Sequence, residues 1–188
     1  MACDMFGVGM GDAACTENYA GTGTVAYLFA AADVDKESLA VDEKLPMYKT
    51  FSLKEGKKIY PIALKVQSNK VDSTGLGPNK GFSNVATIVA ERDLDRLAVL
   101  QRTVNNKRCG LLLKKPGTAS GAYILWNESV DTTFEFADTT GDTFDSDNTS
   151  TWTVTSAPMV YSRMYIPEDQ FTALTVAEET ADGGGAGA

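Results

Sequence analysis

The stretch FSNVATIVAERDLDRLAVLQRTVNNKRCGLLLKK, residues 82–115, decides the fold. Its first part, residues 82–90, is rich in small and β-branched residues, which is typical of a strand. The next part, residues 92–105, carries an apolar stripe at helical spacing, formed by Leu94, Leu97, Leu100 and Val104. The segment CGLLLKK then returns to strand character. The sequence therefore predicts a strand, one helix and a second strand.

The predicted helix has recognisable ends. Asp93 is a good N-cap, Asp95 adds a negative charge to the first turn, and Asn105 and Asn106 form a stop signal. We expect this helix to lie across one face of a sheet and to contribute its stripe to the core.

Strand patterns continue after the helix. Residues 111–113 and 122–126 are unbroken apolar runs, which are expected where a strand is covered on both faces. Residues 129–137 alternate instead, with Val130, Thr132, Phe134 and Phe136 predicted inward and Asp131, Thr133 and Glu135 outward. Residues 151–155 do the same, with Trp152 and Val154 inward. Because one helix cannot cover every strand, we expect another subunit to supply part of the covering surface.

The sequence before residue 82 predicts three more strands. Residues 24–32 form the first, with Val25, Tyr27 and Phe29 on one face. Residues 47–54 and 59–70 are predicted as two strands joined by a turn at Glu55 and Gly56, and Pro61 indicates an edge position or a strand start.

The regions between these strands read as loops. The polar segment 33–46 is expected to connect rather than to pack, and residues 72–81 form a turn-rich loop.

The chain is predicted to be one domain with an extension at each end. Residues 1–23 are a glycine-rich, flexible N-terminal arm, residues 24–166 form a single β-rich domain, and residues 167–188 are a C-terminal extension that ends in a Gly/Ala tail.

Composition argues against catalysis. The chain has no histidine, and its three cysteines are scattered, so histidine-based catalytic sites and a four-thiolate zinc site are excluded. Reduced, structural thiols are expected. We predict no catalytic residues, no cofactor-binding residues, no metal ligands and no cofactor. One alternative stays open, a calcium site in the acidic loop at Asp142, Asp145 and Asp147, although this loop lacks the glycine and glutamate of an EF-hand.

Charge is unevenly distributed along a chain of net charge −8. Residues 116–162 contain no Lys or Arg but carry seven carboxylates, whereas residues 44–80 hold eight lysines. Two interpretations remain. Either two solvated faces happen to segregate, or the acidic half of one copy meets the basic half of the next. Non-specific DNA binding is disfavoured because it calls for a basic domain.

No targeting or membrane segment is visible in the sequence. There is no Lys or Arg before Lys36, and no apolar run approaches the roughly 20 residues of a membrane span. We expect no membrane association, and a protein kept in the cytoplasm or in a particle assembled there.

The order and texture of these elements resemble the phage major tail tube protein family. VATIVAERDLDRLAVLQRTVNNKRCGLLLKK is similar to the strand, helix and strand core of such proteins, and SVDTTFEFADTTGD followed by STWTVTSAP is similar to their last hairpin. The N-terminal MACD also resembles the start of tail proteins from phages of Bacteroidetes hosts. The resemblance covers residues 24–165.

The resemblance implies a mainly β fold: a tail-tube-like β-sandwich or half-barrel with one flanking helix at about 91–105, extended loops and flexible termini. It implies a structural virion protein whose sheets join those of its copies in a six-membered ring. Rings would stack into a tail, assembled in the host cytoplasm. DNA would pass through an acidic lumen without specific binding, and the other partners would be sheath, terminator or baseplate proteins.

Two features depart from this family. The Gly/Ala extension and the long 33–46 loop are not its hallmarks, and they leave open another ring-forming virion protein of the same fold, such as a terminator, connector or baseplate protein. A calcium- or ligand-binding β-sandwich module is the remaining alternative, and an enzyme is not expected.

Overall fold

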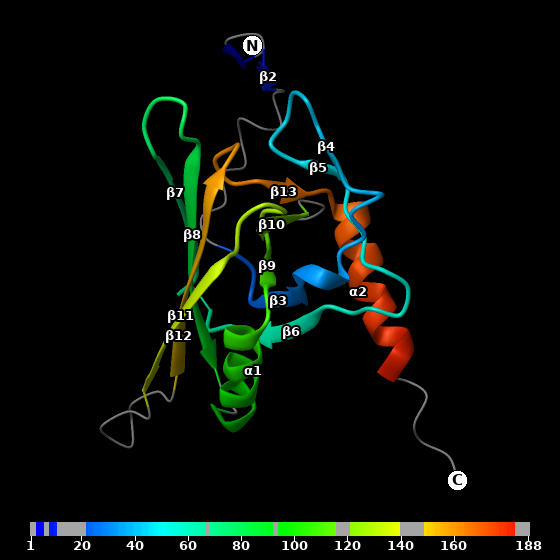
Figure 1. Cartoon of the computed structure of the whole chain (residues 1–188), viewed down its shortest axis with the longest axis vertical. Coiled ribbons are helices and arrows are strands. Elements are labelled where there is room, and N and C mark those ends of the chain that lie inside the picture. Colours follow the sequence, from blue (N-terminus) through cyan, green and yellow to red (C-terminus); the bar gives the residue numbers. More distant parts are fainter. Residues whose placement is uncertain are drawn as a thin grey trace.

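The computed structural model describes residues 3–5, 8–10, 22–66, 68–91, 94–115, 121–139 and 149–182. Within them the fold is mainly β, as predicted, and two antiparallel sheets pack face to face. Figure 1 shows three layers: a four-stranded sheet, a five-stranded sheet, and a covering layer that includes the C-terminal helix α2.

The five-stranded sheet lies in the middle of the molecule. Its strands, in spatial order, are β13 (Tyr165–Ile166), β10 (Ala122–Leu125), β9 (Cys109–Lys114), β3 (Val25–Ala30) and β6 (Tyr60–Ala63). The central strand β9 is buried over five consecutive residues, as its unbroken apolar run predicts.

The four-stranded sheet contains the longest strands. Its order is β11 (Thr133–Thr139), β12 (Thr149–Met159), β8 (Phe82–Glu91) and β7 (Lys70–Gly75). Trp152 and Val154 point inward and are fully buried, and Phe134 and Phe136 are partly buried on the same side, as the alternation predicts.

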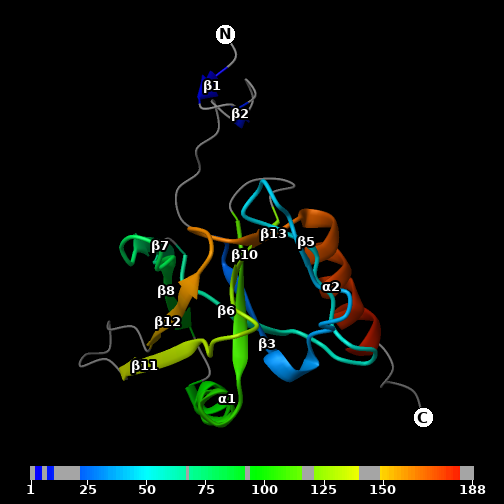
Figure 2. The same ribbon diagram turned by 45° about the horizontal axis from the view of Figure 1, so that its top comes forward.

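The first core fills the space between the two sheets. Ile88 and Trp152 from one sheet meet Leu111 and Leu113 from the other. Helix α1 (Leu94–Asn106) adds Leu97 and Val104, and Leu100 packs against the same cluster. Figure 2 shows α1 below the two sheets, where it closes one end of this core. The predicted stripe is therefore confirmed for these three residues. The side chain of Leu94 and the predicted N-cap Asp93 lie outside the described residues.

The second core covers the opposite face of the five-stranded sheet. It contains an aromatic group of Phe29, Tyr48, Phe51 and Trp126, whose ring centroids lie 5.3–6.4 Å apart. Helix α2 (Glu168–Asp182) adds Phe171, which meets Tyr27 edge-on at 5.4 Å.

Two expectations about this face are wrong. The 33–46 segment packs as well as connects, since it follows the short 3₁₀ helix η1 (Ala31–Asp33), buries Val34 completely and includes β4 (Ala40–Val41). No other subunit is needed to cover β9 and β10, because this segment, β5 (Tyr48–Thr50), its flanking residues and α2 cover them from within the chain.

The strands predicted at residues 47–54 and 59–70 are also corrected. A turn does exist at Gly56, with φ +72°, but β5 pairs with β4 rather than with β6. The second strand is split, because β6 belongs to the five-stranded sheet and β7 to the four-stranded sheet. The loop predicted at 72–81 is shorter than expected, since residues 72–75 are part of β7.

The chain passes from one sheet to the other at a corner between β6 and β7. Leu64 bridges to Ala90 of β8, and the Lys65 N–H donates to the Val89 carbonyl at 2.7 Å. Asn69 completes the corner. Its Oδ1 accepts the Val89 N–H at 2.9 Å, and its Nδ2 donates to the Lys65 carbonyl at 2.7 Å. The two sheets thus form a half-barrel joined along one side.

The two predicted extensions contain regular structure. The N-terminal arm includes a short hairpin of β1 (Cys3–Met5) and β2 (Val8–Met10). Most of the C-terminal extension is α2, so this part is a helix anchored in the second core rather than a flexible segment. The rest of both extensions lies outside the described residues, apart from residues 22 and 23 and Pro167.

Candidate assembly surface

The outer face of the four-stranded sheet is a mainly polar surface whose described residues include no aromatic side chain. The residues that alternate with the core positions along these strands point away from the core, and they are half-buried or exposed. Eight of them are threonines: Thr74, Thr87, Thr133, Thr139, Thr149, Thr151, Thr153 and Thr155. Ser83, Val85, Val89 and Ala137 lie among them. We call this surface the threonine face.

Few charges lie on the threonine face. Lys70 and Asp72 of β7 form an ion pair of 2.7 Å, and Glu135 projects from β11 on the opposite edge. The register also places Glu91 of β8 on this face, opposite Thr149. On the described strands of this face, Lys70 is the one cation, and its neighbour neutralises it.

The two sheets differ in how their edges are protected. In the five-stranded sheet, edge strand β6 carries Pro61, as predicted, and edge strand β13 has only two residues and bridges to Met47. In the four-stranded sheet, edge strands β7 and β11 have six and seven residues, contain no proline, and pair with no further strand among the described residues. Long unblocked edges are templates for pairing with another chain.

The backbone groups on these two edges can be assigned. Val89 of β8 directs its N–H and carbonyl toward the β7 side, to Asn69 and Lys65. In an antiparallel sheet the N–H and carbonyl of one residue point to the same side of the strand, and this side alternates from residue to residue. The even-numbered residues of β7 therefore direct both groups to β8. On the free edge of β7, the backbone groups that point outward therefore belong to Val71, Ser73 and Gly75. The same alternation, followed from β8 to β12 and from β12 to β11, gives Phe134, Phe136 and Asp138 as the outward-pointing residues of β11.

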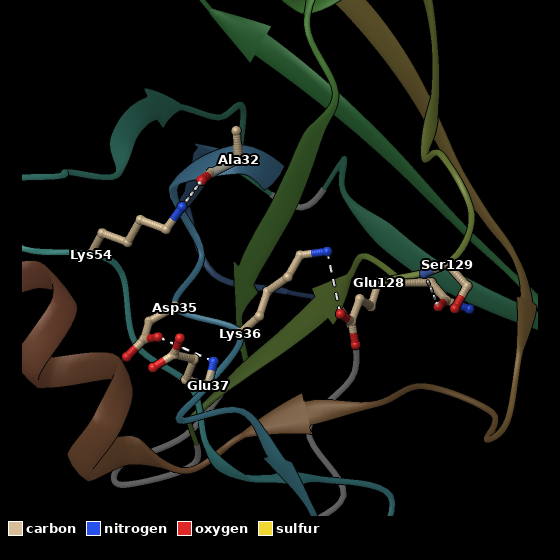
Figure 3. A network of polar contacts seen from close by, with 8 residues as sticks. Ala32, Asp35, Lys36, Glu37, Lys54, Glu128 and Ser129 are labelled. Carbon is tan, nitrogen blue, oxygen red and sulfur yellow. Dashed lines mark hydrogen bonds and ion pairs between the residues drawn. The ribbon is translucent and has the colours of Figure 1, made fainter.

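The four carboxylates of the cation-free stretch that the structure describes do not form a single surface. Glu128 pairs with Lys36 at 3.3 Å (Figure 3), and Asp131 pairs with Arg108. The Asp138 carboxylate accepts hydrogen bonds from Ser150 and from Gln101 of α1, the latter at 2.9 Å. Only Glu135 of these described residues lies on the threonine face. Asp142, Asp145 and Asp147 lie outside the described residues.

A cavity of about 500 Å³ lies beside η1, away from the threonine face. Its walls include Ala30–Asp33, Trp126, Glu128 and four cations: Lys36, Lys57, Lys107 and Arg108. Three of these cations form ion pairs with carboxylates. Lys57 pairs with Asp33 at 3.3 Å, Lys36 pairs with Glu128, and Arg108 pairs with Asp131. Lys54 donates to the Ala32 carbonyl at 2.8 Å nearby (Figure 3). The cavity is therefore cationic on an acidic protein, but its charges largely neutralise one another.

The described residues contain no set of groups suited to metal binding. No cluster of three or more Asp, Glu or Cys side chains occurs among them. Cys109 is a free thiol, and burial raises its pKa, which makes it unreactive. The side chain of Cys3 and all of Cys15 lie outside the described residues.

Sequence reasoning did not single out the threonine face. Its signal was present in TSTWTVTSA, where threonine occupies every second position opposite buried residues. In the described part of the chain, none of the helices is long and apolar enough to cross a membrane. Compared with protein-family models, curated proteins and solved structures, the chain has no significant match.

Proposed function

We propose that this chain is a structural subunit of a bacteriophage tail tube, which assembles into stacked rings that form a channel for genome delivery. The observation that carries the proposal is the pair of long, unblocked edges on the four-stranded sheet. Isolated globular proteins protect such edges with proline, very short strands or charged side chains. This chain uses a proline and a two-residue strand in its other sheet, whereas β7 and β11 are long and have only the charged side chains among these devices, of which Lys70 and Asp72 neutralise each other.

The number of strands supports closure into a ring. In an antiparallel sheet of four strands, the two edge strands run in opposite directions. When copies are arranged around a rotation axis, β11 of one copy therefore meets β7 of the next as an antiparallel pair. Such a head-to-tail contact generates closed rings when the rotation closes, and a closed sheet has no edges left.

The chemistry of the threonine face supports a channel wall. The core and the five-stranded sheet lie on the other side of this sheet, so the threonine face would line the lumen of a ring closed in this way. DNA binds proteins chiefly through cations that displace its counterions. A wall of hydroxyl groups with one neutralised lysine per copy gives DNA no such hold. The lumen proposed here has a net negative charge, because Glu135 and, by its register opposite Thr149, Glu91 of each copy lie on this face, in the same sense as the acidic lumen that the resemblance implies.

Electron microscopy of the purified chain tests this proposal. Rings or tubes are expected at high protein concentration, and a strictly monomeric species under those conditions would refute it. Gly75→Pro removes a backbone N–H that points outward from β7, at a position where a Cβ would meet nothing within 4 Å. We expect this variant to stay a folded monomer, whereas Gly75→Ala, which keeps the N–H, should assemble.

The η1 cavity favours one second candidate, a module that binds a small anion. The cavity's four cations come from three separate segments of the chain, and Lys107 has no ion-pair partner among the described residues. Calorimetric titration with inorganic phosphate discriminates the two functions. Saturable binding that Lys107→Ala weakens, in a protein that stays monomeric, would favour this candidate over the tail tube.

A further inference from the structure

We propose that β11 of one copy pairs with β7 of a second copy in a single register, in which Thr139 lies opposite Lys70, Ala137 opposite Asp72 and Glu135 opposite Thr74. This inference rests on the proposed function, since it names the residues that meet when the two free edges pair. It follows from four constraints on the edges.

The first constraint is the face of the sheet. Odd-numbered residues of β11 and even-numbered residues of β7 point to the threonine face. A slip by one residue would turn the partly buried Phe134 and Phe136 of one copy to the side opposite the core of its neighbour. Only slips by two residues keep both cores on the same side.

The second constraint is the number of backbone hydrogen bonds. In the proposed register, each outward-pointing residue of β11 meets an outward-pointing residue of β7: Phe134 with Gly75, Phe136 with Ser73, and Asp138 with Val71. All six residues of β7 are then paired. A slip by two residues in either direction leaves one outward-pointing residue of β7 without a residue of β11 opposite it, so one of the three hydrogen-bonded pairs is lost. A larger slip loses more of them.

The third constraint is charge on the threonine face. A slip by two residues toward the start of β11 places Glu135 directly opposite Asp72. Like charges directly opposite each other in a sheet are destabilising. In the proposed register Asp72 instead faces the small, uncharged Ala137, and Glu135 faces Thr74.

The fourth constraint is size on the core side. The proposed register places the rings of Phe134 and Phe136 beside Gly75 and Ser73, the two smallest side chains of β7 on that face. Nothing lies within 4 Å of the position that a Cβ on Gly75 would take, so this space is free to receive a ring. Aromatic side chains that cover an edge glycine are a recurrent stabilising pair in sheets.

Disulfide trapping between copies tests the register. Opposed residues on the threonine face are the closely spaced pairs that do not exchange hydrogen bonds, which suits a disulfide. We compare Lys70→Cys with Thr139→Cys against Lys70→Cys with Ala137→Cys, both in a chain carrying Cys3→Ser and Cys15→Ser. The buried Cys109 is retained. Both variants keep Asp72 and Glu135, the two carboxylates that disfavour the slipped register. The variants differ only in the position of the second cysteine on β11, 139 in one and 137 in the other.

The expected result is a shift of the Lys70→Cys, Thr139→Cys variant from monomer to a ladder of multimers on a non-reducing gel after mild oxidation. The Lys70→Cys, Ala137→Cys variant should remain mostly monomeric on the same gel. Rings in the electron microscope together with cross-links through position 137, or with cross-links through neither position, would overturn the register while leaving the proposed function intact. If both variants and the parent chain stay monomeric before oxidation, the proposed function itself fails.

Discussion

Asn69 shows how a single side chain can replace part of a sheet. At the corner between β6 and β7 the backbone ladder is interrupted, and one amide group satisfies both the Val89 N–H and the Lys65 carbonyl. The side chain is only 7% exposed, so water cannot easily take its place. The connection between the two sheets therefore depends on the identity of this residue.

Asn69→Ala should destabilise the protein by about 1–3 kcal/mol, because it leaves a buried donor and a buried acceptor without partners. Urea unfolding of the monomer measures this loss. Asn105→Ala, at an exposed position near the end of α1, is the matched control and should change stability by less than about 0.5 kcal/mol. Equal effects of the two substitutions would show that the corner does not need the amide.

Gly110 in the central strand β9 is required by a neighbouring ring. A Cβ at this position would lie 2.2 Å from Cζ of Phe29, and that ring is itself held by Phe51 and Trp126. Gly110→Ala should therefore cost about 1–3 kcal/mol through overpacking. Gly75→Ala, where the added Cβ meets open space, should leave the urea midpoint of the monomer nearly unchanged. A neutral Gly110→Ala variant would indicate that the aromatic group can move.

Tyr48 makes stability depend on alkaline pH. Burial raises the pKa of its hydroxyl to about 12, with a smaller contribution from Glu128. In the unfolded chain the group ionises near pH 10, so above that pH the unfolded state loses a proton that the folded state retains. Its contribution is present below about pH 10 and is lost as the pH rises toward 12.

Tyr48→Phe should therefore reduce the loss of stability between pH 9 and pH 11.5, as measured by urea unfolding at both values. Tyr60→Phe is the control, because Tyr60 is 58% exposed and its substitution should leave the pH dependence unchanged. The idea is wrong if the two variants and the parent chain lose stability in parallel.

Among the elements, helix α2 differs most from the sequence prediction, which expected only a C-terminal extension here. Gln170 accepts a hydrogen bond from the Phe51 N–H at 2.7 Å and donates one to the Lys49 carbonyl. Phe171 on the next position enters the second core. One helix turn thus fixes both the backbone and the aromatic group of the segment after β5.

Phe171→Ala should cost about 3–5 kcal/mol, the range for removing a buried aromatic ring. Thr172→Ala, on the exposed side of the same turn, should be close to neutral, and urea unfolding distinguishes them. A small effect of Phe171→Ala would mean that α2 is an appendage rather than part of the fold.

Local pattern predicted those elements whose signal is contained in one segment. The stripe of α1, the alternation at Trp152 and Val154 and the proline at an edge each follow from neighbouring residues. The end of β6 at Ala63 does not, because the alternation of Tyr60, Ile62, Leu64 and Val66 continues past this end toward the corner at which Asn69 connects to β8.

The covering role of the 33–59 region and of α2 was missed for a related reason. Each of these segments contributes only a few apolar residues, such as Val34, Phe51 and Phe171. They form a core only because they meet on one face of the five-stranded sheet, which the pattern within any one segment does not show. A start signal for α2 was available in Pro167 followed by Glu168 and Asp169. The threonine face likewise requires knowing which strands are neighbours.

At the scale of the whole molecule, the middle sheet is covered on both faces by the chain itself. We therefore expect a monomer that stays folded when diluted below the concentration at which it assembles. Near-ultraviolet circular dichroism of the dilute protein should show fixed aromatic side chains, and its urea midpoint should not vary with concentration. A midpoint that falls on dilution would mean that the fold needs its copies.

The complete second core has a consequence for timing. In the proposed assembly, the described cores of a subunit are complete before it meets another copy, so they lose little chain entropy at the contact and each addition needs no folding of these cores. Growth of such a polymer is limited by its nucleus. Below the concentration at which that nucleus forms spontaneously, subunits of the proposed tube would accumulate until a template offers the first free edge.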